Sequence, residues 1–180
     1  MGLQQVTAAA DPVVTLEQAK AHCSIEGDDW DDLLGLYIQA ATAEAEQFLD
    51  RSLAPQTWLL TLDDFCGDAI TLPMGPVTNV DSIVYLDDDR VQRTLSPAIY
   101  IEDLISDPQR VVLDPDQSWP NTADLPNGVK ITFTTGFMAV PANAKLAILQ
   151  AVATWFGNRE AGPMPDSALA LLRKLRRVSI

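Results

Sequence analysis

The side chains best suited to nucleophilic catalysis are scarce in this sequence. The chain has one histidine, His22, and two cysteines, Cys23 and Cys66. A catalytic histidine activates a serine or cysteine held against it, but neither a Gly-x-Ser-x-Gly elbow nor a cysteine-nucleophile signature occurs, and Cys23 would point away from His22 on a helix. The sequence therefore indicates no catalytic pair, and it predicts that His22 lies at the surface or at a helix end.

The cysteines and the acidic clusters also fail to form a metal-binding pattern. The two cysteines stand 43 positions apart with no Cys-x-x-Cys pair, which is typical of reduced structural thiols. The acidic clusters at 28–32 and 87–89 lack the Asp-x-Asp-x-Asp-Gly spacing of a calcium loop. We interpret the first cluster as stabilising a helix N-terminus and the second as a turn.

Phosphate-binding loops are missing, and no pair of carboxylates is selected. Neither Gly-x-x-x-x-Gly-Lys-Ser/Thr nor Gly-x-Gly-x-x-Gly occurs, so nothing predicts nucleotide binding. A carboxylate hydrolase stays open as an alternative, because two of the 25 acidic residues can converge in a folded chain, but no spacing selects them. We expect no catalytic residue, no cofactor and no metal.

Composition and charge describe an acidic globular protein with a basic end. The 180 residues are 47% apolar and 21% charged, as in ordinary folded domains, and the net charge is −13. Residues 1–136 carry 23 acidic and six basic side chains, whereas residues 137–180 carry two acidic and six basic ones. An overall basic surface for nucleic acid is therefore missing, and the asymmetry predicts different partners for the two parts.

No segment has the features of a membrane span or a signal peptide. No apolar run approaches the roughly 18 residues that a membrane span needs, and residues 1–5 lack a basic stretch and an apolar core. We expect a protein that is made whole in a cytoplasm and has no membrane partner.

Two helices are expected near the start of the chain. Thr15, followed three residues later by Gln18, forms a capping-box pattern that predicts a helix over 15–23. A second helix is predicted over 29–51, because apolar residues recur there about every 3.6 positions, at Trp30, Leu34, Tyr37, Ala41, Ala45 and Phe48.

The middle of the chain, residues 57–136, has the pattern of β structure. Short β-branched and aromatic runs alternate with Gly, Pro, Asp and Asn. The last run alternates polar Lys130 and Thr132 with apolar Ile131 and Phe133, which predicts one wet and one dry face. The predicted strands cover 58–62, 69–72, 82–86, 99–102, 110–113 and 129–134.

Two further helices are expected at the end. Pro141 is typical of the first turn of a helix, which we predict over 141–158. Its apolar residues lie on nearly all sides of the helix, so we expect them to be buried in a core or between subunits. After a break at 162–165, Asp166 is expected to cap a last helix that reaches about Val178. We therefore predict an α+β fold, a helical bundle of two N-terminal and two C-terminal helices with a central antiparallel β insertion.

The order of these elements resembles that of the tailed-phage head-tail connector, or adaptor, family, also met in prophages and gene transfer agents. The opening of the chain carries the resemblance in Thr15-Leu16-Glu17-Gln18-Ala19-Lys20-Ala21-His22, in the acidic segment 26–34 and in the Ala-rich segment 38–46. Later landmarks are Leu72-Pro73, Pro76-Val77, residues 80–87, residues 132–137, Val140-Pro141, Lys145, residues 147–149 and Trp155-Phe156-Gly157-Asn158-Arg159-Glu160. The resemblance covers residues 12–160 as a head-tail connector domain and leaves 161–180 as a C-terminal basic amphipathic tail helix.

The resemblance implies a structural protein and not an enzyme. Such a protein forms a ring, commonly of twelve copies, below the portal protein and extends the DNA channel toward the tail. The implied partners are the portal protein, neighbouring copies of the chain, a tail-side stopper or tail protein, and duplex DNA that passes without specific binding. The implied location is the neck of a virion or phage-like particle, assembled in the bacterial cytoplasm. An acidic channel wall would repel DNA and let it slide.

Two sets of residues are expected to make these contacts. The subunit interface is expected from the apolar residues of the third helix: Leu146, Ile148, Leu149, Val152, Trp155 and Phe156. The portal contact is expected from the tail helix, with an apolar side and a basic side: Leu171, Leu172, Arg173, Lys174, Leu175, Arg176, Arg177 and Val178. A tail helix folded back on its own acidic chain is the alternative to docking. As a function, an acidic DNA-mimic or inhibitor protein ranks second and the carboxylate hydrolase third.

Overall fold

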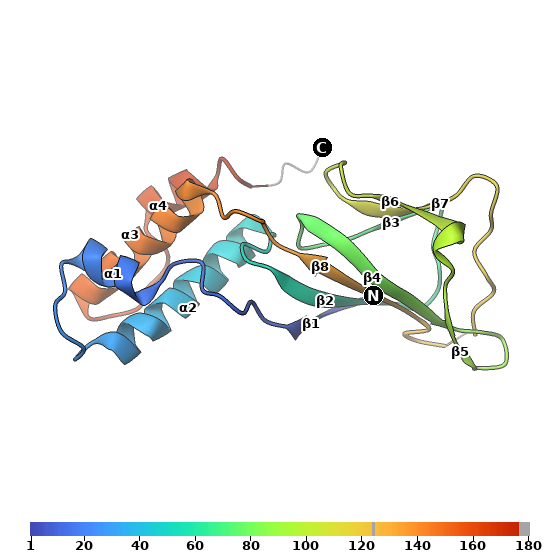
Figure 1. Cartoon of the computed structure of the whole chain (residues 1–180), viewed down its shortest axis with the longest axis horizontal. Coiled ribbons are helices and arrows are strands. Elements are labelled where there is room, and N and C mark those ends of the chain that lie inside the picture. Colours follow the sequence, from blue (N-terminus) through green and yellow to red (C-terminus); the bar gives the residue numbers. More distant parts are fainter. Residues whose placement is uncertain (124, 177–180) are drawn as a thin grey trace. The chain divides into compact units, whose positions relative to one another are not determined.

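The computed structural model describes residues 1–123 and 125–176 and divides the chain into two compact units. The β unit consists of residues 1–8 and 55–136, and the helical unit consists of residues 9–54 and 137–180. Figure 1 shows the four α-helices in the helical unit and the strands in the β unit. The prediction of an α+β fold, with β structure between two pairs of helices, is confirmed.

The helical unit contains the four α-helices that the sequence predicts. They are α1 (Leu16–Cys23), α2 (Asp31–Leu49), α3 (Ala142–Asn158) and α4 (Asp166–Leu172). The bounds of α1, α2 and α3 lie within two residues of the predicted ones. The last helix ends at Leu172 and continues only as a turn, in which the Leu175 amide donates to the Leu172 carbonyl. Val178, the predicted end, lies outside the described residues.

The start of each helix shows which capping predictions hold. The capping box of α1 is present: the Gln18 amide donates to Thr15 Oγ1 over 3.2 Å, and the Thr15 amide donates to Gln18 Oε1 over 3.1 Å. The predicted cap at Asp166 is wrong, because Pro165 is the N-cap and makes no side-chain cap bond. Asp166 instead lies in the first turn of α4, where the helix dipole stabilises a negative charge.

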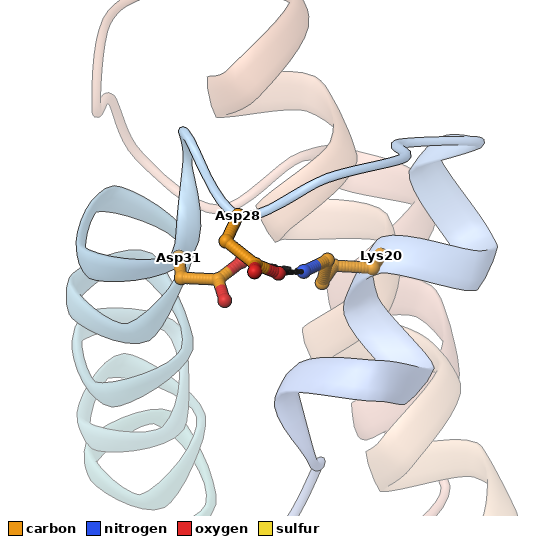
Figure 2. A network of polar contacts seen from close by, with 3 residues as sticks. All are labelled: Lys20, Asp28 and Asp31. Atoms are coloured by element: carbon orange, nitrogen blue, oxygen red, sulfur yellow. Dashed lines mark hydrogen bonds and ion pairs between the residues drawn. The ribbon is translucent and has the colours of Figure 1, made fainter.

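The acidic cluster before α2 pairs with a lysine of α1 (Figure 2). Lys20 Nζ lies 2.7 Å from Asp31 Oδ1 and 3.0 Å from Asp28 Oδ1. The hydrogen bond to Asp31, followed by the one to Asp28, raises the pKa of Lys20 above its ordinary value. Because Asp31 also lies in the first turn of α2, the interpretation of this cluster as stabilising a helix start holds, although no carboxylate caps the helix.

The helical core is built on the predicted stripe of α2. Four of its six residues are buried, Leu34, Tyr37, Ala41 and Ala45, while Trp30 and Phe48 at the two ends are half-buried. Tyr37 packs edge to face on Trp155 of α3, with the ring centroids 5.9 Å apart. Five of the twelve buried positions of α2 and α3 are alanines, whose small side chains let helices approach closely: Ala41, Ala45, Ala144, Ala147 and Ala151.

Two antiparallel sheets make up the β unit. The five-stranded sheet has the order β1-β2-β8-β4-β5, with β1 (Gly2–Thr7), β2 (Gln56–Leu62), β8 (Val129–Thr135), β4 (Val77–Leu86) and β5 (Gln92–Thr94). The three-stranded sheet has the order β3-β7-β6, with β3 (Ala69–Thr71), β7 (Arg110–Leu113) and β6 (Tyr100–Asp103), and the short helix η1 (Pro97–Ile99) precedes β6. Residues of both sheets share one apolar core that includes Leu60, Ile70, Ile83, Val111 and Phe133.

All six predicted strands are present. The strands β1 and β5 and the first part of β4 were not predicted. In β1 all six residues are exposed and in β5 all three, so neither strand has the alternation that marks a half-buried strand. The strand β4 begins at Val77, whereas the prediction began at 82. The first part was missed because register shifts at 77/79 and 80/82 interrupt the alternation of buried and exposed residues. The predicted alternation in β8 is confirmed, with Ile131 and Phe133 buried and Lys130 exposed.

The turn predicted at 87–89 closes the β4–β5 hairpin. Asp87 Oδ1 accepts from the amides of Asp89 and Val91 over 3.0 and 2.8 Å, and Arg93 Nε donates to Asp87 Oδ2 over 2.8 Å. The bond from Arg93, followed by the one from the Val91 amide, lowers the pKa of Asp87 below its ordinary value. The interpretation of this acidic cluster as a turn is confirmed.

Candidate functional site

The groups considered for chemistry are one histidine, two cysteines and the acidic clusters. His22 is exposed near the end of α1, as predicted, and both cysteines are free thiols. Burial raises the pKa of Cys23, which makes the reactive thiolate less available. Among the described residues no group of three or more His, Cys, Asp or Glu side chains is placed to hold a metal ion. No described helix has the length and apolarity required to span a bilayer.

The two carboxylates that line an acidic hollow in the β unit bond to the loop before β8. The hollow, of about 380 Å³, is lined by two carboxylates, those of Asp63 and Asp64. Asp63 Oδ1 accepts from the Asn127 amide over 2.9 Å, and Asp64 Oδ1 accepts from Thr122 Oγ1 over 2.8 Å. These carboxylates therefore act as hydrogen-bond acceptors that fasten the loop before β8.

The apolar surface of α3 is mostly used inside the helical unit. Of the six residues predicted for a subunit interface, Ile148, Val152 and Trp155 are buried, and Leu149 and Phe156 are half-buried against the same core. The helix packs against α1, α2 and α4, which explains why its apolar residues point nearly all round. Leu146 differs from the others because it is 41% exposed. It is the residue of this set that offers the largest exposed fraction to a neighbouring molecule.

The tail helix folds back on its own helical unit. Ala168 and Leu172 are fully buried in the helical core, and Leu171 and Leu175 are half-buried against it. The fold-back alternative therefore describes this structure, with apolar burial as the main contact. Leu172 is closed to any partner while α4 stays packed. The basic residues Arg173, Lys174 and Arg176 are exposed, whereas Arg177 and Val178 lie outside the described residues.

A groove in the helical unit lies beside α4. It has a volume of about 280 Å³ and is lined mainly by apolar side chains: Phe48, Pro163, Met164 and Leu169, with Glu44 and Gln47. Glu44 Oε1 accepts from the Met164 amide over 3.4 Å, which ties the segment before α4 to α2. The guanidinium carbon of Arg176 lies 5.3 Å from the centre of the Phe48 ring. The groove thus has an apolar floor and a cation at its edge.

Sequence reasoning missed this groove because its residues come from three separate segments. The periodicity places Phe48 in the core stripe of α2, and the composition of 162–165 indicates only a break. A helix pattern shows which face of a segment is apolar, but not where two such faces leave a gap. The aromatic residue at the end of the α2 stripe and the Met between two prolines were the available signals.

Comparison with known proteins gives results for both the sequence and the fold. Residues 13–89, which include α1, α2, β2, β3 and β4, match the family model described as phage gp6-like head-tail connector protein. A solved structure of the virion of a native gene transfer agent particle contains a chain that is 25% identical, with a TM-score of 0.81, and the match covers 100% of this chain and 97% of that one. The N-terminal part of the chain therefore matches the head-tail connector family, and the whole chain shares the fold of a chain in a gene transfer agent particle.

Two further solved structures share the connector fold over its whole length. One is the neck of an empty gene transfer agent particle computed with C6 symmetry, and the other is the neck of a native particle computed with C12 symmetry. Both matches have a TM-score of 0.80 and 24% identity, and both cover 100% of this connector chain and 97% of the matched chain. A search of curated proteins gives no match.

The match to the head-tail connector family decides between the function classes left open by the sequence. The connector is a structural protein and not an enzyme, which excludes the carboxylate hydrolase alternative. Asp31, Asp87 and Asp63 do not form the surface array of an acidic inhibitor, because they have structural roles in a helix start, a turn and a loop.

Proposed function

We propose that this connector forms a ring of twelve copies below the portal protein and extends the DNA channel toward the tail. The observation that carries the proposal is the fold match over the full chain, at TM-scores of 0.80 and 0.81, to chains of gene transfer agent particles and their necks. The C12 symmetry of one of these necks supports the copy number. Assembly is proposed to occur in the bacterial cytoplasm, with a stopper or tail protein as the partner on the tail side.

Neighbouring copies are proposed to contact one another through two different surfaces, so that one surface of each copy meets the other surface of the next copy. A ring with one rotational axis requires heterologous contacts, in which two distinct patches meet. Leu146 of α3 is proposed as part of one such patch, since its side chain is exposed whereas most of its apolar neighbours on α3 are enclosed.

The portal contact is proposed to use the exposed end of the tail helix without unpacking it. Arg173 and Lys174 supply positive charge, and Leu171 and Leu175 supply partly exposed apolar surface. Leu172 supports this surface from inside, where it is fully buried. Acidic groups at the rim of the portal protein would match the basic residues, and Arg177 follows them in the sequence.

Duplex DNA is proposed to pass through the channel without specific binding. The β unit has 13 acidic and four basic residues in sequence, and a wall with this excess repels phosphates and leaves few ionic contacts to break during ejection. The connector therefore would guide DNA without holding it.

Cryo-electron microscopy of particles from the encoding host tests the proposed function. We expect twelve copies of the connector as a ring between portal and tail, and we expect tailless heads when its gene is deleted. A single copy per particle, or normal tailed particles without the chain, would contradict the proposal.

A charge-reversal variant tests the portal contact separately. Arg173→Glu combined with Lys174→Glu changes two exposed residues, so the protein should fold normally but enter particles at least tenfold less often. Lys130→Glu, an exposed charge reversal on β8, is the matched control and should be incorporated normally. Equal incorporation of both variants would rule out the basic end as the portal contact.

A further inference from the structure

The hairpin between β6 and β7 presents an apolar side chain to solvent. Ile105 is 99% exposed at the tip of this hairpin, although isoleucine is among the residues most often buried. The tip is held from both sides: the Ser106 amide donates to Asp103 Oδ1 over 3.2 Å, and Arg110 Nε donates to Asp103 Oδ2 over 2.9 Å. Leu104 is half-buried against the core of the β unit. Ile105 is therefore held in a fixed turn, which lowers the entropy cost of a contact.

The groove beside α4 has the size and chemistry to accept such a side chain. Its volume is about 280 Å³, and its floor consists of Phe48, Met164 and Leu169 together with a proline. An apolar cavity of about 150 Å³ accommodates benzene, so a branched aliphatic side chain fits in this space. Insertion would cover apolar surface on both sides of the contact.

The hairpin tip has an excess of acidic side chains, and the groove has a cation at its edge. Three acidic residues, Glu102, Asp103 and Asp107, lie within three positions of Ile105. At the groove, Arg176 lies against Phe48, and the Glu44 carboxylate of the wall accepts from the Met164 amide. Attraction between these groups would align the hairpin with the groove.

A second exposed apolar residue lacks this complementarity. Met138 is 98% exposed in the segment between β8 and α3, but residues 131–144 contain no charged side chain. Its exposure matches that of Ile105, whereas its surroundings cannot pair with a basic groove edge. Met138 thus provides a control for exposure without charge.

We infer that Ile105 of one connector copy inserts into the groove formed by Phe48, Met164 and Leu169 of the next copy. This inference rests on the proposed ring and specifies its subunit contact. Each copy supplies one hairpin tip and one groove, so the same heterologous contact repeats until the ring closes. The acidic residues beside Ile105 then face Arg176 of the neighbour.

Cross-linking between two single-cysteine variants tests the contact. Both variants carry Cys23→Ser and Cys66→Ser; one adds Ile105→Cys and the other adds Gln47→Cys, an exposed position on the groove wall. The variants carry different epitope tags and are co-expressed in the host, and the purified particles are treated with a short bismaleimide. We expect a covalent dimer bearing both tags, and at least a tenfold weaker dimer when Met138→Cys replaces Ile105→Cys.

The outcomes separate this inference from the proposed function. If both tagged chains are present as a ring but the Ile105 pair cross-links no better than the Met138 pair, the contact is wrong while the ring stands. A double variant with both cysteines in one chain that yields only an internally linked monomer would also overturn it. If the chain is missing from particles, the proposed function itself fails.

As a second readout, Ile105→Asp should lower ring incorporation at least tenfold, and Ile105→Leu should preserve it.

Discussion

The guanidinium carbon of Arg159 lies 4.4 Å from the centre of the Trp30 ring. Arg159 is the C-cap of α3, and Trp30 is the N-cap of α2, so the contact joins the end of one helix to the start of another. Phe156 completes the cluster, with its ring edge to face on Trp30 at 5.6 Å. Arg159 also lies in the left-handed region, with φ of 57°, which favours glycine. Arg159 thus adopts a backbone conformation that is strained for a residue with a Cβ.

Two substitutions of Arg159 separate the ring contact from the backbone strain. Arg159→Ala removes the cation–π contact and keeps the strain, so we expect the free energy of unfolding to fall by about 1 kcal/mol. Arg159→Gly removes both, and we expect a change of less than about 0.5 kcal/mol, because relief of strain offsets the lost contact. Urea unfolding measures both values. Equal losses for the two variants would mean that the ring contact dominates.

Truncating Leu172 tests whether α4 belongs to the core of the helical unit. Leu172 is fully buried, so Leu172→Ala should lower the free energy of unfolding by about 2–5 kcal/mol. Leu171→Ala, at a half-buried position on the same helix, should cost less than half as much. Thermal or urea unfolding of the purified chain checks this difference. A neutral Leu172→Ala would show that the tail helix is not packed in solution.

Two glycines with different surroundings should respond in opposite directions to alanine. At Gly35, within α2, an added Cβ meets no atom within 4 Å, so Gly35→Ala should stabilise the protein by about 0.5–1 kcal/mol. At Gly128 the added Cβ would lie 2.8 Å from the Asp63 carbonyl oxygen, so Gly128→Ala should destabilise it by about 1–3 kcal/mol. Midpoints of urea unfolding give both signs. The same sign at both sites would refute the packing around Gly128.

The ion pairs of Lys20 predict a loss of stability at alkaline pH. Its pKa is raised in the folded chain, so its contribution is complete below the ordinary value of 10.5 and disappears as the pH rises through the higher folded value. Lys20→Met should therefore be less stable than the parent chain at neutral pH, and the difference should shrink above pH 10.5. Urea unfolding of both proteins across this range measures it. A difference that stays constant with pH would assign the effect to packing of the lysine stem.

Several elements were predictable because their signals are local. The spacing of Leu34, Tyr37, Ala41 and Ala45 reflects the 3.6-residue turn of a helix, and the alternation in β8 reflects the period of a strand. The capping box at Thr15 involves residues three positions apart. In each case neighbours along the chain are also neighbours in space, so a short window of sequence contains the interaction.

The elements that escaped prediction depend on distant partners. The strand β1 consists of exposed residues and is defined by its pairing with β2, more than 50 positions away. The bulges of β4 hide its period, and the contact of Arg159 with Trp30 spans 129 positions. No local pattern records such contacts.

The same division applies to the functional surfaces. By itself the sequence determined that α3 is apolar nearly all round, that the tail helix has apolar and basic residues, and that the chain resembles head-tail connectors. Only the tertiary structure decided that Ile148, Val152 and Leu172 are enclosed while Leu146 and Ile105 are exposed. The physical reason is that hydropathy measures the tendency of a side chain to leave water, whereas the packing of other segments around it decides whether its own chain or a neighbouring molecule provides the cover.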